Sequence, residues 1–486
     1  MTARSVQGGS HHPKGLRFIF LIEMWERFSY YGMRALLILY LVGQIGFDDR
    51  NAYLIYGSYT SLVYVTPLIG GLIADRLIGY RNAIILGGLL ITTGHLLLAL
   101  ENERLWPHSD HAPFFAALAF IVVGTGFLKP NCLALLNSLY DRDDALRDSG
   151  FTIFYLGINV GAALGALIAG WLGETWGWSW GFGAAGLGMI IGLVQFLCGT
   201  RAFDGHGTPS SPRWQSHGRR WLALTVTGAL LGIPVASWLI TDGIIVQYVL
   251  GASGFAVALF ILWTAWRQDD SRASTGMLAG GGLILVSVLF WALYEQAGSS
   301  LNLFTERRLD REFLGYAIPA SMFQALNSIY ILFMAPVLAK LWTVLSRTGR
   351  EPGIAMKFAL GLALLGGGFL VLVQGIAASG EALVPMVYML LLYGLHTLGE
   401  LCLVPPGISS VARMSLARVV GFMMGAWAFA NAVGSYLAGI IATATTDTQG
   451  GVDGISQVYT TIGLAAVAAA AAMAVLDRLL RKIRVP

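Results

Sequence analysis

Charged residues are scarce in this sequence. Only 12% of its 486 residues are Asp, Glu, Lys or Arg, whereas 56% are hydrophobic and the mean hydropathy is +0.66. An ordinary soluble domain has about 25% charged residues. Because the apolar residues recur from end to end, they predict an integral membrane protein in contact with a lipid bilayer. The net charge of +4 is small and indicates no nucleic-acid partner.

Cysteine and lysine are also rare, and each scarcity excludes a class of protein. The three cysteines (Cys132, Cys198 and Cys402) lie in apolar stretches, so they predict small core residues and neither a disulfide framework nor a metal site. None of the five lysines follows a glycine, which excludes a Walker A phosphate loop and an ATP-driven pump built on one. A channel and a membrane-embedded enzyme remain as alternatives to a transporter.

Apolar stretches long enough to cross a bilayer are, by contrast, abundant. A helix needs about 20 apolar residues to cross a hydrocarbon layer ~30 Å thick. Fourteen such stretches are predicted, at residues 16–44, 51–77, 82–100, 113–138, 149–172, 178–198, 220–241, 244–266, 276–301, 313–345, 355–378, 382–411, 417–443 and 455–480. The first contains Glu23, Glu26 and Arg27, which a cleavable secretory signal would not hold, so no such signal is expected.

Basic residues predict the orientation in the membrane, because Lys and Arg favour cytoplasmic connections. They recur in alternate connections, for example at Arg76, Arg81, Arg267, Arg272, Arg413 and Arg418. The connections on the opposite side hold Arg50, Arg104, Arg307, Arg308 and Arg311. This pattern places both termini in the cytoplasm.

The chain is predicted to contain four segments. Residues 199–218 mix Gly, Pro, Ser, His and Arg, which is typical of a linker, here on the cytoplasmic side. This linker follows an N-terminal six-helix bundle over 1–198. It precedes two inserted helices over 219–272, which have few polar residues in their apolar stretches, and a C-terminal six-helix bundle over 273–486. Gly161 and Gly165 have the GxxxG spacing of closely packed membrane helices.

The first helix carries a polar stripe. Glu23, Glu26, Arg27, Tyr30, Tyr31 and Arg34 share one face of an α-helix by their spacing. A charge at the bilayer centre costs roughly 2.5–3.5 kcal/mol, so this face must meet a cavity or a partner helix. One alternative is a purely structural ladder in which the two glutamates neutralise Arg27. Arg34 has no carboxylate in the next turn of the stripe, which favours a functional cavity.

Two other helices of the first half carry isolated polar residues. Lys129 follows an uninterrupted apolar run and precedes Pro130, so its charge either reaches the membrane interface or enters a cavity. Asn159 follows Tyr155 by one turn and either bridges two helices or contacts a substrate.

The second half supplies carboxylates. Polar and aromatic residues pair at helical spacing as Trp291 with Glu295, Gln324 with Asn327, His396 with Glu400, and Trp427 with Asn431. A buried carboxylate is either neutral or paired with a cation. Arg34 and Lys129 of the first bundle therefore complement Glu295 and Glu400 of the second, and a zwitterion fits a cleft between such groups. His396 with Glu400 resembles half of a metal site, but no further His or Cys accompanies it, so no metal is expected.

Several of these motifs also occur together in one known family. Residues 23–32 (EMWERFSYYG) fit the motif ExxERFxYYG without a mismatch. Residues 154–161 (FYLGINVG) are similar to a fifth-helix signature, and residues 71–81 (GLIADRLIGYR) to a loop motif between the second and third helices. Together with residues 290–296, 323–327 and 399–405, they resemble the proton-dependent oligopeptide transporter family of the major facilitator superfamily.

The resemblance implies an all-α membrane protein with the major facilitator fold, in which two six-helix bundles are joined by the two inserted helices of bacterial members. It implies a proton-coupled symporter, not an enzyme, that imports di- and tripeptides by alternating access. The proton is the coupling ion and no cofactor is expected. The expected location is the bacterial inner membrane, and the expected functional unit is a monomer.

The resemblance also implies residue roles. Substrate binding falls to Arg27, Tyr30, Tyr31, Arg34, Tyr64, Lys129, Asn159, Trp291, Asn327, Glu400, Trp427 and Asn431. Proton exchange falls to Glu23, Glu26 and Glu295. The pairs Arg34–Glu295 and Lys129–Glu400 are expected to close the outer and inner sides, and Asp75 and Arg76 to brace a cytoplasmic loop.

Two positions depart from the family pattern. The usual Ser-Pro after the tenth-helix glutamate is replaced by Val404-Pro405-Pro406, and a pocket position that is often Ser is Asn431. Both affect the expected substrate preference and not the class. The nitrate-transporting relatives lack the ExxER triplet, which counts against that branch.

Overall fold

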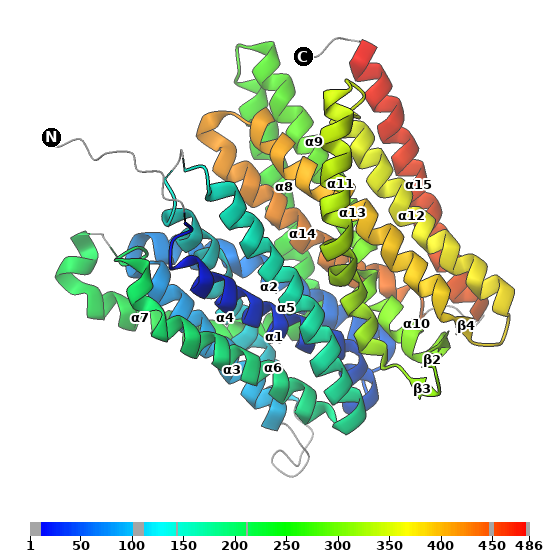
Figure 1. Cartoon of the computed structure of the whole chain (residues 1–486), viewed down its shortest axis with the longest axis horizontal. Coiled ribbons are helices and arrows are strands. Elements are labelled where there is room, and N and C mark those ends of the chain that lie inside the picture. Colours follow the sequence, from blue (N-terminus) through cyan, green and yellow to red (C-terminus); the bar gives the residue numbers. More distant parts are fainter. Residues whose placement is uncertain (1–10, 101–110, 142–143, 210–211, 447–451, 483–486) are drawn as a thin grey trace. The chain divides into compact units, whose positions relative to one another are not determined.

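The structure is almost entirely helical (Figure 1). The computed structural model describes residues 11–100, 111–141, 144–209, 212–446 and 452–482. Arg104, which contributed to the predicted orientation, lies outside the described residues.

The first half of the chain forms α1 (Leu16–Tyr40), α2 (Asp49–Ile73), α3 (Tyr80–Leu100), α4 (Ala112–Ser138), α5 (Arg147–Trp176) and α6 (Trp178–Cys198). Short π-helical turns at Leu41–Ile45 and Ala74–Ile78 extend α1 and α2, and a 3-10 turn at Thr200–Phe203 follows α6. The inserted pair is α7 (Pro212–Thr241) and α8 (Gly243–Trp266).

The second half forms α9 (Ser271–Tyr294), α10 (Ser300–Arg308), α11 (Ala325–Arg347), α12 (Ile354–Ser379), α13 (Met386–Met414), α14 (Val420–Thr443) and α15 (Val452–Lys482). Turns of 3-10 helix at Glu295–Gly298, Ala320–Gln324 and Ala417–Val419 precede α10, α11 and α14. Two-residue strands pair as β1 (Leu309–Asp310) with β4 (Val384–Pro385) in parallel, and β2 (Glu312–Phe313) with β3 (Tyr316–Ala317) in antiparallel.

Packing divides the chain into two compact units. One contains the described parts of Met1–Met33 and Val65–Trp238, and the other those of Arg34–Tyr64 and Leu239–Pro486. Each of α1 and α2 therefore contributes to both units. Because these units follow packing and not chain order, the predicted division into bundles, linker and inserted pair stays a prediction.

Small residues bring α1 and α5 together in the first unit. A Cβ atom added to Gly161 would lie 2.0 Å from the carbonyl oxygen of Met24, and one added to Gly165 would lie 2.2 Å from that of Phe28. No side chain fits at such distances, so the two backbones touch directly. The close packing predicted from the GxxxG spacing is confirmed.

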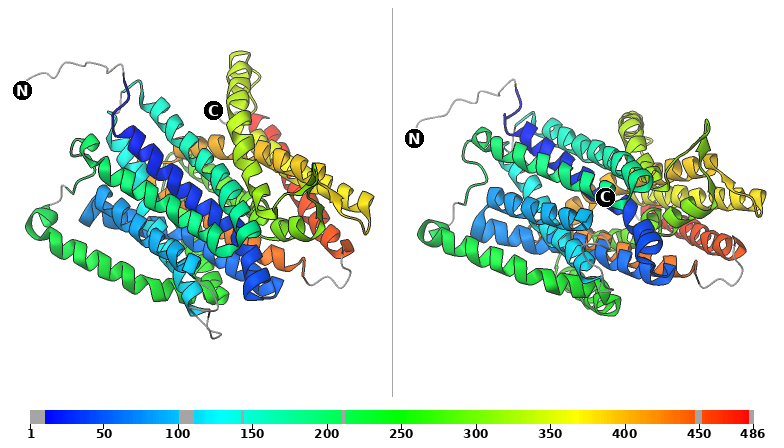
Figure 2. Two further views of the ribbon diagram at one scale, coloured as in Figure 1. Left: turned by 60° about the horizontal axis from the view of Figure 1, so that its bottom comes forward. Right: turned by 90° about the horizontal axis from the view of Figure 1, so that it is seen from below.

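Long contacts between helices organise the second unit. α12 packs along α13 and α15, and α9 packs along α14; the yellow α12 and the red α15 run side by side in each view (Figure 1, Figure 2). Their shared interior is apolar, with Phe358, Leu362, Phe369 and Leu372 fully buried on α12 and Tyr459 on α15.

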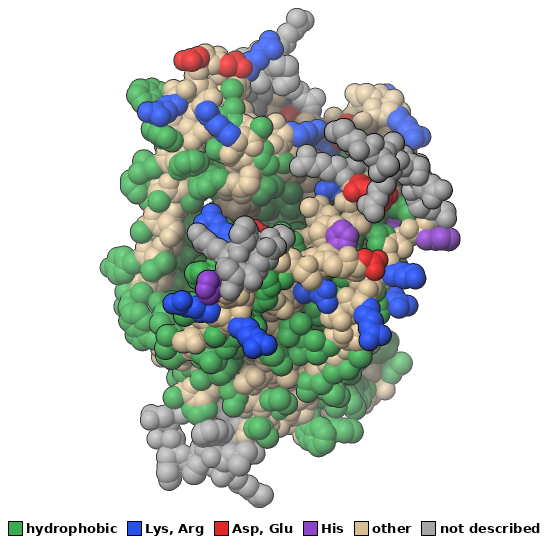
Figure 3. All heavy atoms as spheres, turned by 90° about the vertical axis from the view of Figure 1, so that its left-hand side faces the viewer, with side chains coloured by type: hydrophobic (Ala, Val, Ile, Leu, Met, Phe, Trp, Pro, Cys, Tyr) green, Lys and Arg blue, Asp and Glu red, His purple; other side chains and the backbone are tan. Residues whose placement is uncertain are grey.

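The helices have the length and composition of membrane spans. Thirteen helical segments in the described parts of the chain are long and apolar enough to cross a bilayer. The fourteenth long helix is α1, whose five Arg and Glu residues lower its hydropathy. Large apolar side chains are exposed on the helices, and Figure 3 shows them covering much of one face. The predicted all-α membrane fold of fourteen long helices is confirmed.

One predicted span is wrong at its start. The stretch 313–345 was expected to be helical throughout, but its first residues form the β2–β3 hairpin and helical structure begins at Ala320. Leu314 and Gly315 have φ values of 53° and 78°, which is the backbone of a tight two-residue hairpin turn and not of a right-handed helix. Pro319 then adopts an extended backbone immediately before the helical residues.

Candidate functional site

Arg27 lies between two carboxylates of its own helix. Its Nη2 donates to Glu26 Oε1 over 2.6 Å, and its Nε contacts the other Glu26 oxygen and lies 3.5 Å from Glu23 Oε1. All three residues are at most 3% exposed. The ion-pair ladder that the stripe allowed is therefore present. One guanidinium balances only one of two carboxylates, so the second needs a proton or another cation.

A second cation comes from α4. Lys129 and Cys132 are one turn apart, and both lie near Glu23. Cys132 is fully buried and Lys129 is half-buried. Lys129 therefore lies near the cluster of Glu23, Glu26 and Arg27.

Tyrosines border this cluster, whereas Asn159 is bonded within its own helix. The guanidinium carbon of Arg27 lies 5.3 Å from the ring centre of Tyr30 and 5.9 Å from that of Tyr31, within cation–π range. Asn159 on α5 is buried, and its Nδ2 donates to the backbone carbonyl of Tyr155 over 3.0 Å. That bond uses one of the two amide hydrogens, so the Asn159 side chain can form a further hydrogen bond.

Arg34 pairs with Glu295, the pair that the family resemblance implied. Its Nη2 contacts Glu295 Oε2, and its Nε donates to the hydroxyl of Tyr56 over 2.7 Å. Arg34 is 7% exposed and Glu295 is 3% exposed. The guanidinium that lacked a carboxylate on its own helix therefore finds one in the 3-10 turn after α9.

A glycine makes room for this pair. The 3-10 turn at Glu295–Gly298 places Gly298 against Tyr56 and Arg34. A Cβ atom at Gly298 would lie 1.7 Å from the Tyr56 hydroxyl oxygen and 3.0 Å from Arg34 Nη2. Only glycine leaves the space that the Arg34–Glu295–Tyr56 cluster occupies.

Glu400 has a separate set of neutral partners. Tyr294 donates its hydroxyl to Glu400 Oε2 over 2.6 Å, and Asn327 Nδ2 donates to the same oxygen over 2.9 Å. Asn327 Nδ2 also lies 3.2 Å from Thr397 Oγ1. Three helices, α9, α11 and α13, thus position one carboxylate through hydrogen bonds.

His396 has a packing role in this structure. Its Nε2 donates to the backbone carbonyl of Leu365 over 3.1 Å, and its ring centre lies 4.8 Å from that of Phe369. The residue is 2% exposed. Within the described residues, no group of three or more His, Cys, Asp or Glu side chains is arranged to hold a metal ion.

The remaining predicted pocket residues lie in the second unit. Trp291 is buried with its ring centre 5.5 Å from that of Tyr294, and Trp427 is buried 6.5 Å from Phe358. Asn431 is half-buried and accepts a hydrogen bond from Ser435 Oγ over 3.3 Å. Tyr64 is half-buried on α2.

Asp75 and Arg76 lie apart from these clusters, in the π-helical turn between α2 and α3. Both are exposed, and Asp75 hydrogen-bonds Tyr80. The turn faces residues 207–209 across a small cavity of about 210 Å³, and the Arg81 amide donates to the Gly207 carbonyl over 3.1 Å. The first part of the predicted linker is therefore docked on this turn.

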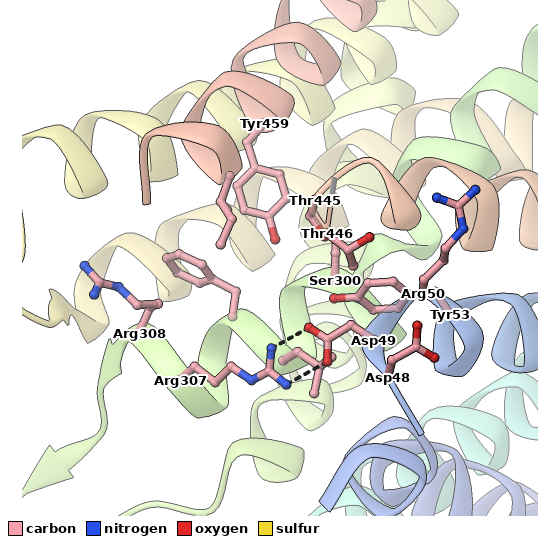
Figure 4. Close-up of a pocket in the computed structure, with 13 residues that line it drawn as sticks. Asp48, Asp49, Arg50, Tyr53, Ser300, Arg307, Arg308, Thr445, Thr446 and Tyr459 are labelled. Carbon is pink, nitrogen blue, oxygen red and sulfur yellow. Dashed lines mark hydrogen bonds and ion pairs between the residues drawn. The ribbon is translucent and has the colours of Figure 1, made fainter. Parts of the chain in front are cut away.

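A larger cavity of about 620 Å³ lies in the same unit as the Arg34–Glu295 pair (Figure 4). It is lined by residues of α2, α10 and α15 and by the end of α14. Arg307 closes one wall with two hydrogen bonds to Asp49, of 2.5 and 2.8 Å. Arg307 is 47% exposed at its side chain, so this pair is screened by solvent and contributes less than a buried one.

The structure thus forms three polar clusters from the predicted residues. Glu23, Glu26 and Arg27 form one, with Lys129 near it, Arg34 and Glu295 form the second, and Asn327 and Glu400 the third. Sequence reasoning missed four partners: Tyr56, Cys132, Tyr294 and Thr397. A signal for Tyr56 was present, because Tyr53, Tyr56, Thr60 and Tyr64 form a hydroxyl stripe at helical spacing on α2.

Comparison with known proteins gives concordant matches. The sequence profile of the POT family matches residues 81–459. The peptide transporter YePEPT of Yersinia enterocolitica is 35% identical over 454 residues, covering 88% of this chain and 87% of the relative. Dipeptide and tripeptide permease A of Salmonella typhimurium is 33% identical over 468 residues, covering 95% and 91%.

Solved structures agree with the sequence relatives. A crystal structure of the peptide transporter POT in complex with sulfate superimposes with a TM-score of 0.83 at 32% identity, covering 98% of this chain and 96% of that one. A structure of tetrameric PepTSo2 gives 0.82 at 28% identity, covering 96% and 99%.

The fold and the buried ionic clusters define a multi-span membrane transporter of the major facilitator fold, and not an enzyme. Within that class the chain belongs to the POT family, and the predicted family is confirmed.

Proposed function

We propose that this protein imports di- and tripeptides together with protons, by alternating access. The observation that carries the proposal is the Arg34–Glu295 pair: a guanidinium and a carboxylate, both buried within membrane-spanning helices, are held together beside Tyr56. Protonation of Glu295 removes its charge and releases Arg34. Binding of a proton to Glu295 therefore frees the Arg34 guanidinium. The freed guanidinium can then bind the carboxylate of a peptide, so the peptide binds only after protonation. Relatives named as di- and tripeptide permeases support the substrate class.

The proposed substrate contacts follow from the charge of each group. Arg27, Arg34 and Lys129 present positive charge to the peptide carboxylate, and Glu400, held by Tyr294 and Asn327, receives the peptide ammonium group. Tyr30, Tyr31, Tyr64, Asn159, Asn327 and Asn431 supply hydrogen bonds, and Trp291 and Trp427 border side-chain pockets.

The proposed proton sites are Glu295, Glu23 and Glu26. Glu23 and Glu26 both contact Arg27, so a proton on either carboxylate weakens the electrostatic attraction between that carboxylate and the guanidinium. Arg34–Glu295 is proposed to close the outer side. Lys129 and Glu400 belong to different packing units, and their pairing on the inner side remains a prediction.

The wider setting is proposed on the same basis. Six-helix bundles over 1–198 and 273–486, joined by the 199–218 linker and the inserted pair over 219–272, rock about a site near the middle of the bilayer. The protein lies in the bacterial inner membrane with both termini cytoplasmic. The monomer is the transporting unit, and Asp75 and Arg76 brace the cytoplasmic turn. The proton is the coupling ion, with no cofactor.

The test uses the full chain in proteoliposomes. Labelled dialanine uptake is driven by an inward proton gradient in the wild type, in Glu295→Gln and in Glu312→Gln, whose exposed glutamate lies in the β2–β3 hairpin. We expect Glu295→Gln to lose driven uptake while retaining exchange of labelled peptide at equal pH, and Glu312→Gln to behave as the wild type. Driven uptake that survives in Glu295→Gln would remove Glu295 from the coupling mechanism.

Competition then tests the two charged poles. Unlabelled dialanine with a blocked amino or carboxyl terminus should compete at least about tenfold more weakly than free dialanine, because a buried ionic group left unpaired costs more than 1.4 kcal/mol. Equal competition by all three peptides would contradict recognition of a zwitterion.

A further inference from the structure

An open apolar groove lies between α8 and the helices α9 and α14, all of the second unit. It has a volume of about 400 Å³ and is formed by residues 254–262 of α8, 278–288 of α9 and 426–433 of α14. Every lining side chain is apolar, and the most prominent are Val257, Ile261, Leu285 and Phe429. The floor contains glycines, and a Cβ atom added to Gly282 would meet nothing within 4 Å. The groove is therefore space at the helix surface that no residue of these helices fills.

The position of the groove indicates that it faces the hydrocarbon part of the bilayer. All three helices are membrane spans, and Leu285 is 71% exposed. The lining segments of α8 and α9 cover eight and ten residue steps, or roughly 12 and 15 Å of helix. This length is about half of a ~30 Å hydrocarbon core, which is the depth of one leaflet. An acyl chain lying along the helices has the length and the chemistry that the groove accepts.

One end of the groove leads to a polar and aromatic connection between α8 and α9. Trp266 is 82% exposed, and the guanidinium carbon of Arg267 lies 4.5 Å from the ring centre of Trp263. Exposed tryptophan and arginine at a helix end are typical of the membrane interface. Arg267 follows the last lining residue of α8 by five positions, and Arg272 precedes the first of α9 by six, so each lies roughly 7–9 Å beyond the groove along its helix.

The charges of this connection select the headgroup. Arg267, Asp269, Asp270 and Arg272 are all exposed. Asp270 is occupied as the N-cap of α9, where it accepts from the Arg272 amide over 2.9 Å. Two guanidinium groups and one carboxylate remain, and they complement a phosphate next to an ammonium group. Since Asp270 keeps its negative charge at the cap, the four charges sum to zero, so a zwitterionic headgroup leaves the connection neutral and an anionic headgroup adds an unbalanced negative charge.

We propose that the groove binds one acyl chain of a phosphatidylethanolamine-type phospholipid, whose phosphate contacts Arg267 and Arg272 and whose ammonium group contacts Asp269. The lipid then fills the surface between the inserted α8 and the α9–α14 pair. This assignment rests on the groove and its charged end, and it is independent of the proposed transport function.

Lipid binding to the purified, delipidated full chain tests the assignment. Native mass spectrometry measures the affinities of phosphatidylethanolamine, phosphatidylglycerol and phosphatidylcholine with matched acyl chains. Phosphatidylethanolamine should bind most tightly to the wild type. Gly282→Leu places a side chain in the groove and should weaken that binding by roughly tenfold, since about ten carbon contacts of the acyl chain are lost.

Matched variants distinguish lipid binding in the groove from lipid binding elsewhere on the protein surface. Gly251→Leu adds the same side chain on α8, where Gly251 also has open space but does not line the groove, and it should leave lipid affinity unchanged. The double variant Arg267→Gln with Arg272→Gln should bring the three lipids to similar affinities. Equal thermal unfolding midpoints for Gly282→Leu and Gly251→Leu would establish that both variants fold.

Three outcomes would overturn the assignment. Phosphatidylglycerol could bind as tightly as phosphatidylethanolamine to the wild type, which would exclude the ammonium contact. Gly251→Leu could lose as much affinity as Gly282→Leu, which would exclude the groove. A dimer mass that is present without lipid and lost in Gly282→Leu would identify a second copy of the chain as the occupant.

Discussion

Arg34 and Glu295 illustrate what a buried ion pair requires of its two residues. Breaking such a pair by removing one partner costs about 3–5 kcal/mol, because the other charge stays buried without compensation. We therefore expect Arg34→Met and Glu295→Met each to lower the free energy of unfolding by that amount. The double variant should recover a large part of the loss, since no charge is left unpaired.

Thermal unfolding in detergent, followed by intrinsic fluorescence, measures this recovery. The exposed pair of Arg311 with Glu306, whose carboxylate side chain is 42% exposed, is the matched control. Its removal through Glu306→Gln should cost less than about 1 kcal/mol. Additive losses in the Arg34–Glu295 double variant would mean that the two side chains are not energetically coupled.

Residue types and spacing were sufficient to find the ionic groups but not all of their partners. The stripe on α1 identified Glu23, Glu26 and Arg27 as one cluster because their relation lies within a single helix. Cys132 and Tyr294 were missed, since each is an ordinary residue of an apolar stretch until packing places it against a carboxylate of another helix. Single-sequence periodicity carries no information about which faces of two helices meet.

The contact between α1 and α5 depends on small residues, and Gly161 makes the closest approach of the two glycines described above. Because a Cβ atom at Gly161 would lie 2.0 Å from the Met24 carbonyl oxygen, Gly161→Ala forces the two backbones apart. Overpacking of this kind typically costs about 1–3 kcal/mol, and we expect a lower unfolding midpoint. Gly251→Ala, which adds the same methyl group in open space, should not change it. Equal midpoints for the two variants would show that the helices can separate without cost.

The connection between α11 and α12 contains a carboxylate whose ionisation should affect stability. Lys357 Nζ donates to Glu351 Oε1 over 2.5 Å, and this hydrogen bond lowers the pKa of Glu351 below its ordinary value. The contribution to stability is therefore complete above the ordinary glutamate pKa and is lost as the pH falls through the lowered, folded-state pKa.

Comparison of Glu351→Gln with the wild type at two pH values checks this dependence. At pH 7 the variant should unfold at a slightly lower temperature, on the order of 1 °C or less, because the Glu351 side chain is 38% exposed and its ion pair is screened by solvent. The difference should disappear at a pH below the folded-state pKa of Glu351, where the wild-type carboxyl is also neutral. A difference that is unchanged between neutral and acidic pH would contradict the assignment to the ionised form.

Helix positions were predictable because apolar length alone determines a membrane span. The exception is the β2–β3 hairpin, which occupies the start of the predicted span over 313–345. Its Leu-Gly turn has positive φ at both residues, yet leucine gives little warning of that conformation. The continuation of α9 through a 3-10 turn into α10 was likewise hidden, because the turn at Glu295–Gly298 forms to bring Glu295 against Arg34.

Movement of charge is a property of the whole transport cycle. Dialanine is a zwitterion with no net charge at neutral pH, so each proton imported with it carries one positive charge across the membrane. A potential of 100 mV, negative inside, provides about 2.3 kcal/mol per charge. In proteoliposomes with equal pH on both sides, we expect this potential alone to accumulate dialanine roughly fifty-fold for one coupled proton.

The dependence of accumulation on potential then distinguishes coupled transport from its alternatives. With two protons per peptide the limiting ratio at the same potential would be the square of that value, so the slope of log accumulation against potential reports the stoichiometry. An uncoupler should reduce the ratio to one while leaving the initial rate of exchange intact, because exchange needs no net charge movement. A channel would reach a ratio of one at every potential, since the zwitterion itself senses none of the field. A ratio of one in the absence of uncoupler would therefore contradict proton-coupled import even if dialanine entered the vesicles.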